Sequence, residues 1–467
     1  MAIKADQELR SLDRESLAKV MLHPAQREIA ADIAELIGGL RKIEQPSHLF
    51  ELQQYLFGLV YQVEVRRSQC KRIFELLKKR GHLPTKDLPA PPPYGDPADP
   101  STWELEVYVY ARLARQLRTI GDGLAWCCFG YDRRIILTLC RNKWAGPIYP
   151  KNGVPYERRR IEELWKEHGH FALHHDLTNC LRIADLTEFT ADGGAVLREI
   201  KAPGTKQKKA QKERAQAAVN ALMHGGQLPG DRDARLIQLN EPYITNLEQL
   251  GDLIELAKEH GCRGMKLSQG RALVASSVTK VIERWGQDFT VADHVLATTR
   301  ARAVKRAGID TALHHINGYS SDTASRSPIM APWSIYPFNP IDCAAIVCDL
   351  LVFETIVSAT ALVESMARAG LTGEVLLPLG NGKLDGEMGV VRGHWRDRSI
   401  TWHAYGLNLL LFELAEPDTL ARGTREVLVL DNPAAEPVMV YANEPATWLP
   451  RIKDRSTSED PHALRET

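Results

Sequence analysis

The spacing of hydrophobic residues divides the first third of the chain into helical stretches around a proline-rich segment. Up to residue 83 the apolar residues recur at helical spacing, as in residues 50–59 and 73–77, and apolar helices return over 103–141. Seven prolines over residues 84–100 interrupt this pattern, because they exclude a helix or a central strand. The prediction is a helical N-terminal region over 1–83, a linker over 84–102 and a helical segment over 103–149.

The central part of the chain has the pattern of two short strands around a tight turn. Residues 181–186 and 196–201 are apolar runs of strand length, and Asp192, Gly193 and Gly194 lie between them. Glycine supplies the positive φ that a tight turn needs, so these runs predict a two-stranded hairpin. The elements expected around the hairpin are a helix at 157–168, a strand at 171–176, a helix at 205–224 and a strand at 235–239.

Beyond residue 240 helical and strand patterns alternate, which predicts a mixed α/β region over residues 241–450. The longest apolar stretch, residues 341–363, is interrupted by three acidic residues, so it predicts a buried helix rather than a membrane span. The polar residues 451–467 predict a disordered tail. The expected elements are helices at 247–260 and 344–369, and strands at 272–276, 373–379, 400–403, 426–430 and 437–441.

The composition limits what the chain can do. Its 467 residues carry a formal net charge of zero with 25% charged residues, which is ordinary for a globular protein of several domains. A protein that only coats nucleic acid is usually strongly basic, so a nucleic-acid contact would be a local patch, as in an enzyme. The eight cysteines lack metal-ligand spacing and the N-terminus lacks a signal-peptide pattern, so we expect reduced thiols and a cytoplasmic location.

Three charged residues of the hairpin form the candidate chemistry. Side chains alternate along a strand, so Glu199 and Lys201 share one face, while Val196 and Ile200 point to the other. Asp185 joins the charged face if the loop holds an odd number of residues, as in a three-residue loop with glycine in the left-handed position. A two-residue turn would put the two carboxylates on opposite faces.

These residue types suit metal-assisted phosphate chemistry. Asp185 and Glu199 would be hard oxygen ligands for Mg²⁺ or Mn²⁺, which can clamp a phosphodiester and lower the pKa of a bound water. The Lys201 ammonium would stabilise the charge that develops on the phosphate. Asp185 followed by Glu199-Ile200-Lys201 resembles the PD-(D/E)XK nuclease superfamily, with Ala184 in place of the proline. The resemblance implies a nuclease core over residues 150–240, in which Asp185, Glu199 and Lys201 are catalytic.

The resemblance also implies further residues around the site. A glutamate of the first core helix often assists the metal in this family, and Glu163 or Glu162 would serve here. Some branches place a glutamine where Gln207 and Gln211 lie. The helix after the lysine strand carries a basic run that either touches the nucleic-acid backbone or is an ordinary solvated face. This run comprises Lys206, Lys208, Lys209, Lys212 and Arg214.

Two adjacent histidines, His174 and His175, suggest a second metal hypothesis. On a strand they would face opposite ways, which argues against one shared ion. Two interpretations stay open, a structural role for both or one imidazole facing the nuclease cleft.

The sequence therefore predicts an α+β multidomain protein with a central restriction-endonuclease-like core, a helical N-terminal region and a C-terminal α/β module. The expected function is Mg²⁺- or Mn²⁺-dependent hydrolysis of phosphodiester bonds in DNA, with RNA as an alternative. By analogy of architecture, this suits a bacterial restriction-type or antiviral defence effector. The alternative is a non-catalytic nucleic-acid-binding or interaction protein with a degenerate nuclease core. Besides nucleic acid, a second copy or another protein could bind the N- or C-terminal region, and no membrane partner is expected.

Overall fold

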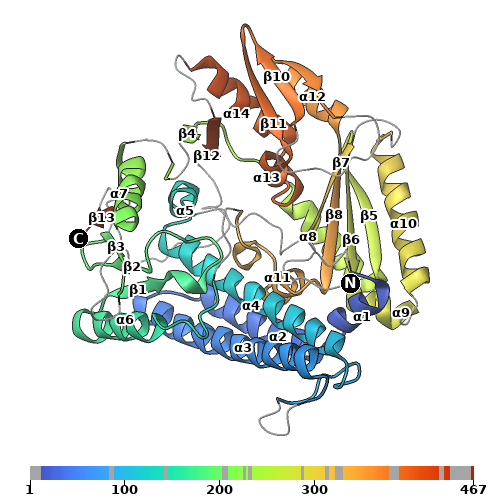
Figure 1. Ribbon diagram of the computed structural model, residues 1–467. Coiled ribbons are helices and arrows are strands. Elements are labelled where there is room, and N and C mark those ends of the chain that lie inside the picture. The colour runs from blue at the N-terminus through green and yellow to red at the C-terminus, as the bar shows by residue number, and fades with distance from the viewer. Residues whose placement is uncertain are drawn as a thin grey trace. The chain divides into compact units, whose positions relative to one another are not determined.

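The chain contains both α-helices and β-strands and forms two compact units (Figure 1). Unit 1 comprises Met1–Arg232, Thr323–Cys348 and Pro445–Thr467, and unit 2 comprises Asp233–Asp322 and Asp349–Glu444. The polypeptide therefore leaves unit 1 twice and returns twice. The computed structural model describes residues 12–83, 89–140, 146–201, 209–224, 228–229, 234–285, 289–310, 315–320, 330–377, 389–430, 436–441 and 464–466.

Unit 1 is built on two long helices that pack against each other, α3 (Pro46–Arg80) and α4 (Pro100–Cys128). Each begins with a proline in its first turn, where the missing N–H costs nothing, and Asp99 caps α4 by accepting from the Ser101 N–H. Trp103 of α4 is buried among apolar residues of α3. The proline-rich segment, predicted as a linker, joins two helices of one unit. The other helices of unit 1 are α1 (Arg14–Met21), α2 (Pro24–Arg41), α5 (Arg133–Leu139), α6 (Val154–His168), α7 (Lys209–His224) and α11 (Pro340–Val347).

The sheet of unit 1 contains the predicted hairpin. Its strand order is β1 (Phe171–His174), β2 (Leu186–Phe189), β3 (Ala195–Arg198) and β13 (Leu464–Glu466). Thr190 and Gly194 are hydrogen-bonded to each other, which leaves the three loop residues 191–193, and Gly193 has φ 81°. The hairpin with a three-residue loop and a left-handed glycine is confirmed, and its odd loop places Asp185 opposite Glu199 in the continued register.

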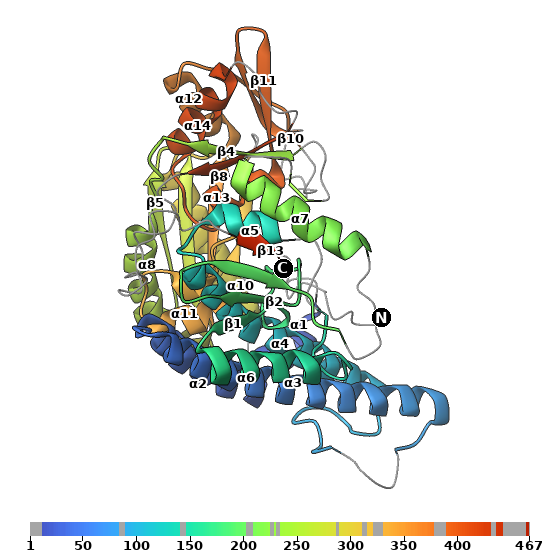
Figure 2. The same cartoon turned by 90° about the vertical axis from the view of Figure 1, so that its left-hand side faces the viewer.

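Helices α3 and α6 cover β1, as Figures 1 and 2 show. Ile161 and Leu164 of α6 pack against Ala172 of β1. On the edge of the sheet, Gln53 of α3 takes the place of a neighbouring strand, because its side chain donates to the Ala172 carbonyl (2.9 Å) and accepts from the His174 N–H (2.9 Å). The amide thus satisfies two edge groups that would otherwise be buried without partners.

Two predictions about the edges of this sheet differ from the structure. The strand expected at 235–239 forms as β4 (Ala234–Leu239), but it belongs to unit 2 and pairs in parallel with β12 (Glu436–Tyr441). The place beside β3 is taken by β13, which pairs in parallel with residues Ala195 to Leu197. Part of the tail expected to be disordered is therefore a strand of the sheet of unit 1.

Unit 2 is centred on an antiparallel sheet with the order β5 (Cys262–Ser268), β6 (Arg271–Ser277), β8 (Leu351–Ser358) and β7 (His315–Tyr319). Helices α8 (Leu247–His260) and α10 (Phe289–Arg306) pack on it. A second sheet has the order β11 (Arg398–His403), β10 (Gly389–Trp395) and β9 (Thr372–Val375). The remaining helices are α9 (Val278–Trp285), α12 (Ala359–Arg368), α13 (Asn408–Leu411) and α14 (Pro417–Val429).

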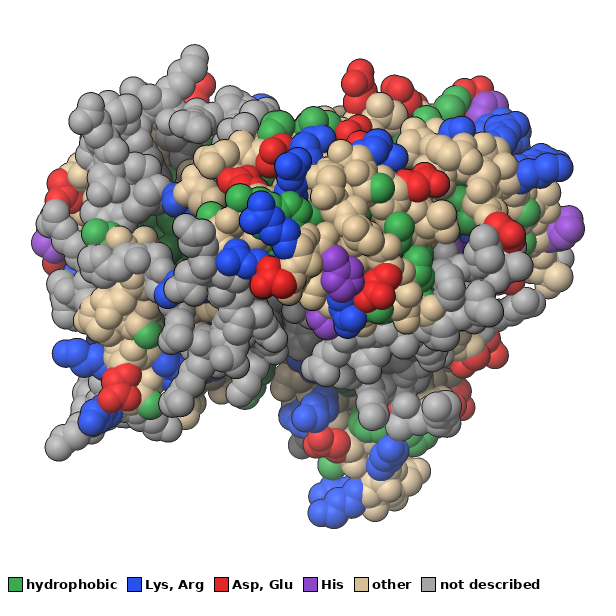
Figure 3. All heavy atoms as spheres, turned by 90° about the horizontal axis from the view of Figure 1, so that it is seen from above, with side chains coloured by type: hydrophobic (Ala, Val, Ile, Leu, Met, Phe, Trp, Pro, Cys, Tyr) green, Lys and Arg blue, Asp and Glu red, His purple; other side chains and the backbone are tan. Residues whose placement is uncertain are grey.

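Two elements predicted beyond residue 240 are wrong. The helix expected over 344–369 is divided into α11, β8 and α12, because Asp349 adopts φ 57° and ends the helical path before a run rich in β-branched residues. The strand expected over 426–430 lies within α14, which starts at Pro417 and buries Val427 and Leu428 on its inner face. None of the described helices has a segment long and apolar enough to span a bilayer. On the face in Figure 3, basic and acidic side chains are interspersed among the described residues, in keeping with the zero net charge.

A buried ion pair joins the two long helices of unit 1. Arg118 of α4 donates to Glu64 of α3 (Nη2 to Oε1, 2.6 Å), and their side chains are only 3% and 2% exposed. The other oxygen of Glu64 accepts from the backbone N–H groups of Ile148 (2.6 Å) and Tyr149 (2.9 Å). Glu64 thus fixes the segment that leads into α6.

We predict that Glu64→Gln destabilises the protein by about 3 kcal/mol, because it leaves the Arg118 cation buried without its counter-charge. Urea unfolding followed by circular dichroism would measure the change. Glu75→Gln on the same helix is the control, since its ion pair with Lys71 is exposed and should contribute less than about 0.5 kcal/mol. Equal effects of the two substitutions would contradict this role of Glu64.

Candidate active site

An irregular loop leads into the hairpin and is fixed by buried polar groups. Asp122 of α4 accepts from the backbone N–H groups of Asn179 (2.6 Å) and Cys180 (2.9 Å). Arg182 donates to the carbonyl oxygens of Thr178 (2.7 Å) and Asn179 (2.9 Å). These bonds satisfy backbone groups that no helix or strand pairs, and they therefore hold the loop in one conformation.

The loop ends in a turn that aims Asp185 at the neighbouring strand. Ala184 has φ 68°, a left-handed conformation that is uncommon for alanine. Asp185 then enters the sheet, where its N–H donates to the Arg198 carbonyl (3.0 Å). Its carboxylate accepts from the Ile200 N–H (Oδ2, 2.7 Å). The Asp185 side chain is thus fixed by the strand that carries Glu199.

The structure brings together the three residues predicted to be catalytic. The Lys201 Nζ lies 2.8 Å from Glu199 Oε2 and 3.6 Å from Asp185 Oδ2. Gln211 of α7 donates to the same Glu199 oxygen (3.1 Å), which is the position the family resemblance indicated for a glutamine. The side chains of Asp185, Glu199 and Lys201 are 20%, 11% and 24% exposed, so they are sheltered but reachable from solvent.

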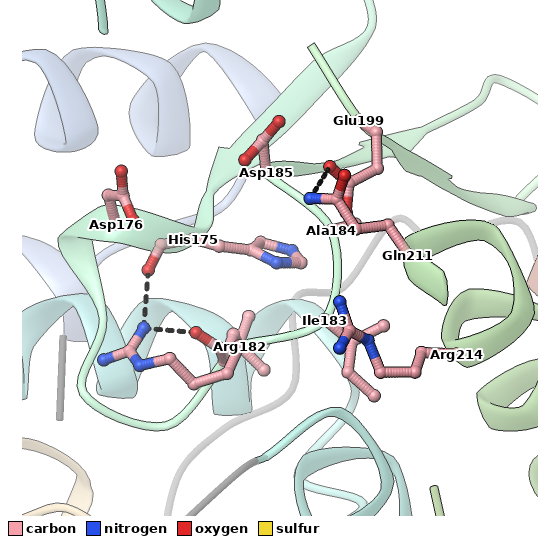
Figure 4. A pocket seen from close by; sticks show the side chains of 10 residues that line it. His175, Asp176, Arg182, Ile183, Ala184, Asp185, Glu199, Gln211 and Arg214 are labelled. Carbon is pink, nitrogen blue, oxygen red and sulfur yellow. Dashed lines mark hydrogen bonds between the residues drawn. The ribbon is translucent and has the colours of Figure 1, made fainter. Parts of the chain in front are cut away.

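Asp185, Glu199 and Gln211 line a cavity of about 180 Å³, whereas Lys201 is not among its lining residues (Figure 4). Residues from the loop, the hairpin and α7 enclose it, so three segments distant in sequence contribute to one site. Its lining comprises His175, Asp176, Leu181, Arg182, Ile183, Ala184, Asp185, Glu199, Gln211 and Arg214.

The Asp185 carboxylate lies in a field that disfavours its charge. Burial, and then the negative charge of Glu199, raise the pKa of Asp185 to about 6, although the Ile200 N–H and Lys201 act in the opposite direction. One ammonium therefore does not compensate the two carboxylates. The site has a deficit of positive charge next to two oxygen donors, which is the environment that a divalent cation would relieve.

The two adjacent histidines point to different partners, which supports the argument against one shared ion. The His174 Nε2 lies 2.8 Å from Glu157 Oε2, and both side chains are almost completely buried. His175 follows β1 in a short 3-10 helix, η2 (His175–Leu177), and its Nε2 lies 2.7 Å from the Thr187 hydroxyl. Burial lowers the pKa of His175 to about 3, so its ring, which lines the cavity, is neutral at physiological pH.

The glutamate of α6 whose charge acts on Asp185 is Glu157, whereas Glu163 and Glu162 were expected to assist the metal. Glu163 pairs with Arg160 (3.3 Å), is 39% exposed and does not line the cavity, and Glu162 is 41% exposed. Glu157 is 2% exposed, and its charge contributes to the raised pKa of Asp185. The burial of Glu157 could have been predicted from helical spacing. Glu157 lies on the same face of α6 as Ile161 and Leu164, which follow it by four and seven residues and are buried.

Glu157 belongs to a second polar cluster that the sequence reasoning missed. Ligand atoms of Glu157, His174 and Asp176 lie within 4.8 Å of one another. Lys151 forms ion pairs with both Glu157 (3.1 Å) and Asp176. The lysine ammonium therefore already supplies the positive charge that these two carboxylates require.

The five residues of the predicted basic run differ in where the structure places their side chains. Lys206 and Lys208 lie outside the described residues. Lys209 is 91% exposed and pairs with Glu213, and Lys212 is exposed. Arg214 alone of the three described members lines the cavity.

The chain matches no protein-family model, no curated protein and no solved structure. An assignment of function therefore has to come from the geometry and electrostatics of this site.

We predict that Asp185→Asn stabilises the metal-free protein at pH 7 by roughly 1–3 kcal/mol, because the carboxylate ionises there at an energetic cost. The folded-state pKa of about 6 exceeds the ordinary value of 3.8. The contribution of Asp185 to stability is therefore fully present below pH 3.8 and is lost as the pH rises through 6. Urea unfolding of both proteins in chelator at pH 4, 5, 6 and 7 would measure the difference. A difference that stays constant with pH would contradict the raised pKa.

Proposed function

We propose that the chain is a metal-dependent nuclease that hydrolyses phosphodiester bonds, with DNA as the polymer. The observation that carries this proposal is the convergence of Asp185, Glu199 and Lys201 on one hairpin, at 2.8 and 3.6 Å from the lysine nitrogen. The pattern of Asp185 followed by Glu199-Ile200-Lys201 resembles that of the PD-(D/E)XK superfamily. We assign the core of unit 1 to that fold on this resemblance.

The residues present fit a hard divalent cation. Asp185 and Glu199 would hold Mg²⁺ or Mn²⁺, because their oxygens are the donors these ions prefer and the raised pKa of Asp185 indicates missing positive charge. When bound, the ion supplies polarisation of the phosphodiester and a lower pKa for a water molecule.

The protein's own groups orient the site and offset charge. Burial alone would lower the pKa of Lys201, but the hydrogen bond with Glu199 and the charge of Asp185 raise it, so the lysine stays an ammonium. An ammonium fixed beside the scissile phosphate stabilises the negative charge that develops on its oxygens. Gln211 keeps the Glu199 carboxylate oriented by donating to it (3.1 Å). Ile200 does the same for Asp185 through its N–H (2.7 Å).

Unit 2 has a different role in this proposal. Among its described residues no cluster of three metal-ligating side chains is present, so we assign it to selecting the substrate or a partner protein. A restriction-type or antiviral defence effector likewise combines a nuclease core with a region that selects the substrate or a partner. We place the chain in that functional class by analogy of architecture.

We predict that the purified protein cleaves DNA with Mg²⁺ or Mn²⁺ and not with chelator. Asp185→Asn, Glu199→Gln and Lys201→Met should each lower the cleavage rate at least about 100-fold, because each removes a group that acts on the reacting phosphate. Single-turnover gels with single- and double-stranded DNA and RNA would measure the rates and identify the polymer.

Glu167→Gln is the control for this experiment, because Glu167 is an exposed carboxylate of α6 outside the site. It should cleave at the wild-type rate. Nucleic-acid binding that persists in chelator without any cleavage would overturn the proposal and indicate a degenerate core that only binds.

A further inference from the structure

Helix α7 turns one of its cations into the cavity. Arg214 lies three residues after Gln211, so the two side chains share a face of the helix, and both line the cavity. Lys212 is two residues from Arg214, which places it on a different side of the helix, and it is exposed. The basic run therefore contains two kinds of cation, one inside the site and others in solvent.

Arg214 lines the cavity without a counter-ion among the described residues. It forms no hydrogen bond and no ion pair with any other described residue, although three carboxylates line the same cavity: Asp176, Asp185 and Glu199. The other cations near these carboxylates have partners, since Lys201 pairs with Glu199 and Lys151 pairs with Asp176. Arg214 thus shares a cavity with three carboxylates and is beyond ion-pair distance of each of them.

The direction of the Arg214 side chain shows what that space can hold. In Figure 4 its guanidinium lies beside Ile183, across the pocket from the carboxylates of Asp185 and Glu199. The neutral His175 ring lines the cavity between them and adds no charge. An anion in this space would have the guanidinium on one side and the carboxylate pair, with its cation, on the other.

The size and chemistry of the cavity favour a phosphate group. Its volume of about 180 Å³ lies below the roughly 300 Å³ at which pockets begin to enclose whole small molecules. A phosphate with its ester oxygens is a smaller group that presents paired oxygens to a guanidinium. Arginine binds such oxygens through two parallel N–H donors and stays charged at any physiological pH.

We propose that Arg214 binds the phosphate group at the point of cleavage, facing the Asp185–Glu199 pair across the cavity. This inference rests on the proposed nuclease function and adds to it a substrate-binding residue and the chemical class of its ligand. The phosphate is either an internal phosphodiester or a terminal phosphate of a strand. Both present the same oxygens to Arg214, and the form of the substrate separates them.

The test compares Arg214→Met and Arg214→Lys with Arg159→Met. Arg159 is an exposed arginine of α6 outside the cavity, so Arg159→Met makes the same substitution at a position where no effect on cleavage is expected. We expect Arg214→Met to lower the single-turnover cleavage rate about 100- to 1000-fold, the usual effect of removing one donor to a reacting oxyanion. Arg214→Lys should recover part of the rate, because it keeps the charge and loses the paired donors. Arg159→Met should cleave like the wild type, and an equal rate for Arg214→Met would overturn the proposal.

Substrate form identifies the source of the phosphate. If Arg214 reads an internal phosphodiester, the wild type cuts circular single strands and Arg214→Met loses this activity. If Arg214 binds a terminal phosphate, the wild type cuts linear strands that carry a 5′-phosphate and leaves circular strands intact. Arg214→Met then no longer prefers phosphorylated over unphosphorylated linear strands. Equal losses of cleavage on phosphorylated and unphosphorylated linear strands, with circles spared, would overturn the assignment.

Binding separates a failure of this inference from a failure of the proposed function. Fluorescence anisotropy of a labelled oligonucleotide in Ca²⁺, which shares the oxygen-ligand preference of Mg²⁺, measures affinity without depending on turnover. If the wild type binds but cuts nothing, the nuclease proposal fails, while a tenfold or larger loss of affinity in Arg214→Met still supports the phosphate contact. Unchanged affinity in Arg214→Met would overturn the phosphate contact in that case.

Discussion

The position of Asp185, and with it the whole candidate site, depends on a buried carboxylate in the helical region. Asp122 of α4 is the acceptor for two backbone N–H groups and for the side-chain amide of Asn179 (2.9 Å). Burial raises the pKa of Asp122, and the hydrogen bonds from Asn179 and Cys180 oppose this shift. A buried acid with these partners is costly to displace, so the loop that ends at Asp185 has one favourable conformation.

A second residue of α4 connects the same loop to the helical core. Arg118 donates from Nε to the Asp176 carbonyl (2.9 Å) and from Nη2 to Glu64 of α3 (2.6 Å). The N-terminal helices therefore support the hairpin of the candidate site and are not a separate module. Precise placement of reacting groups by rigid elements is what metal-dependent hydrolysis requires.

The hairpin and its three charged residues were predictable because all the information is local. Side-chain alternation puts Glu199 and Lys201 on one face, but the sequence left two loop lengths open for Asp185, and the three-residue loop of the structure places it opposite Glu199. The helix α8 (Leu247–His260) was predicted to the residue for a similar reason, since its apolar spacing is regular.

The features that sequence reasoning missed depend on contacts between distant segments. Nothing in the residues of β4 says that it pairs with β12 instead of β3, because strand pairing is set by the tertiary fold. The cavity likewise joins Asp176 of η2 to Arg214 of α7, and no spacing rule connects two such positions. The apolar run over 344–369 was misread because a buried strand and a buried helix have the same composition, and only the turn at Asp349 separates them.

The return of the chain to unit 1 has a consequence for biosynthesis. Arg41 of α2 donates to the Tyr336 carbonyl (2.8 Å), and Ser334 donates to the Thr119 carbonyl of α4 (2.8 Å), so the helical support includes residues made after much of unit 2. The strand β13, which closes the sheet beside β3, follows all of unit 2 in sequence. A ribosome would therefore release most of the polypeptide before unit 1 could be completed. The nascent chain would therefore lack a fully supported candidate site until late in synthesis, and a fragment that ends at residue 232 would lack these supports.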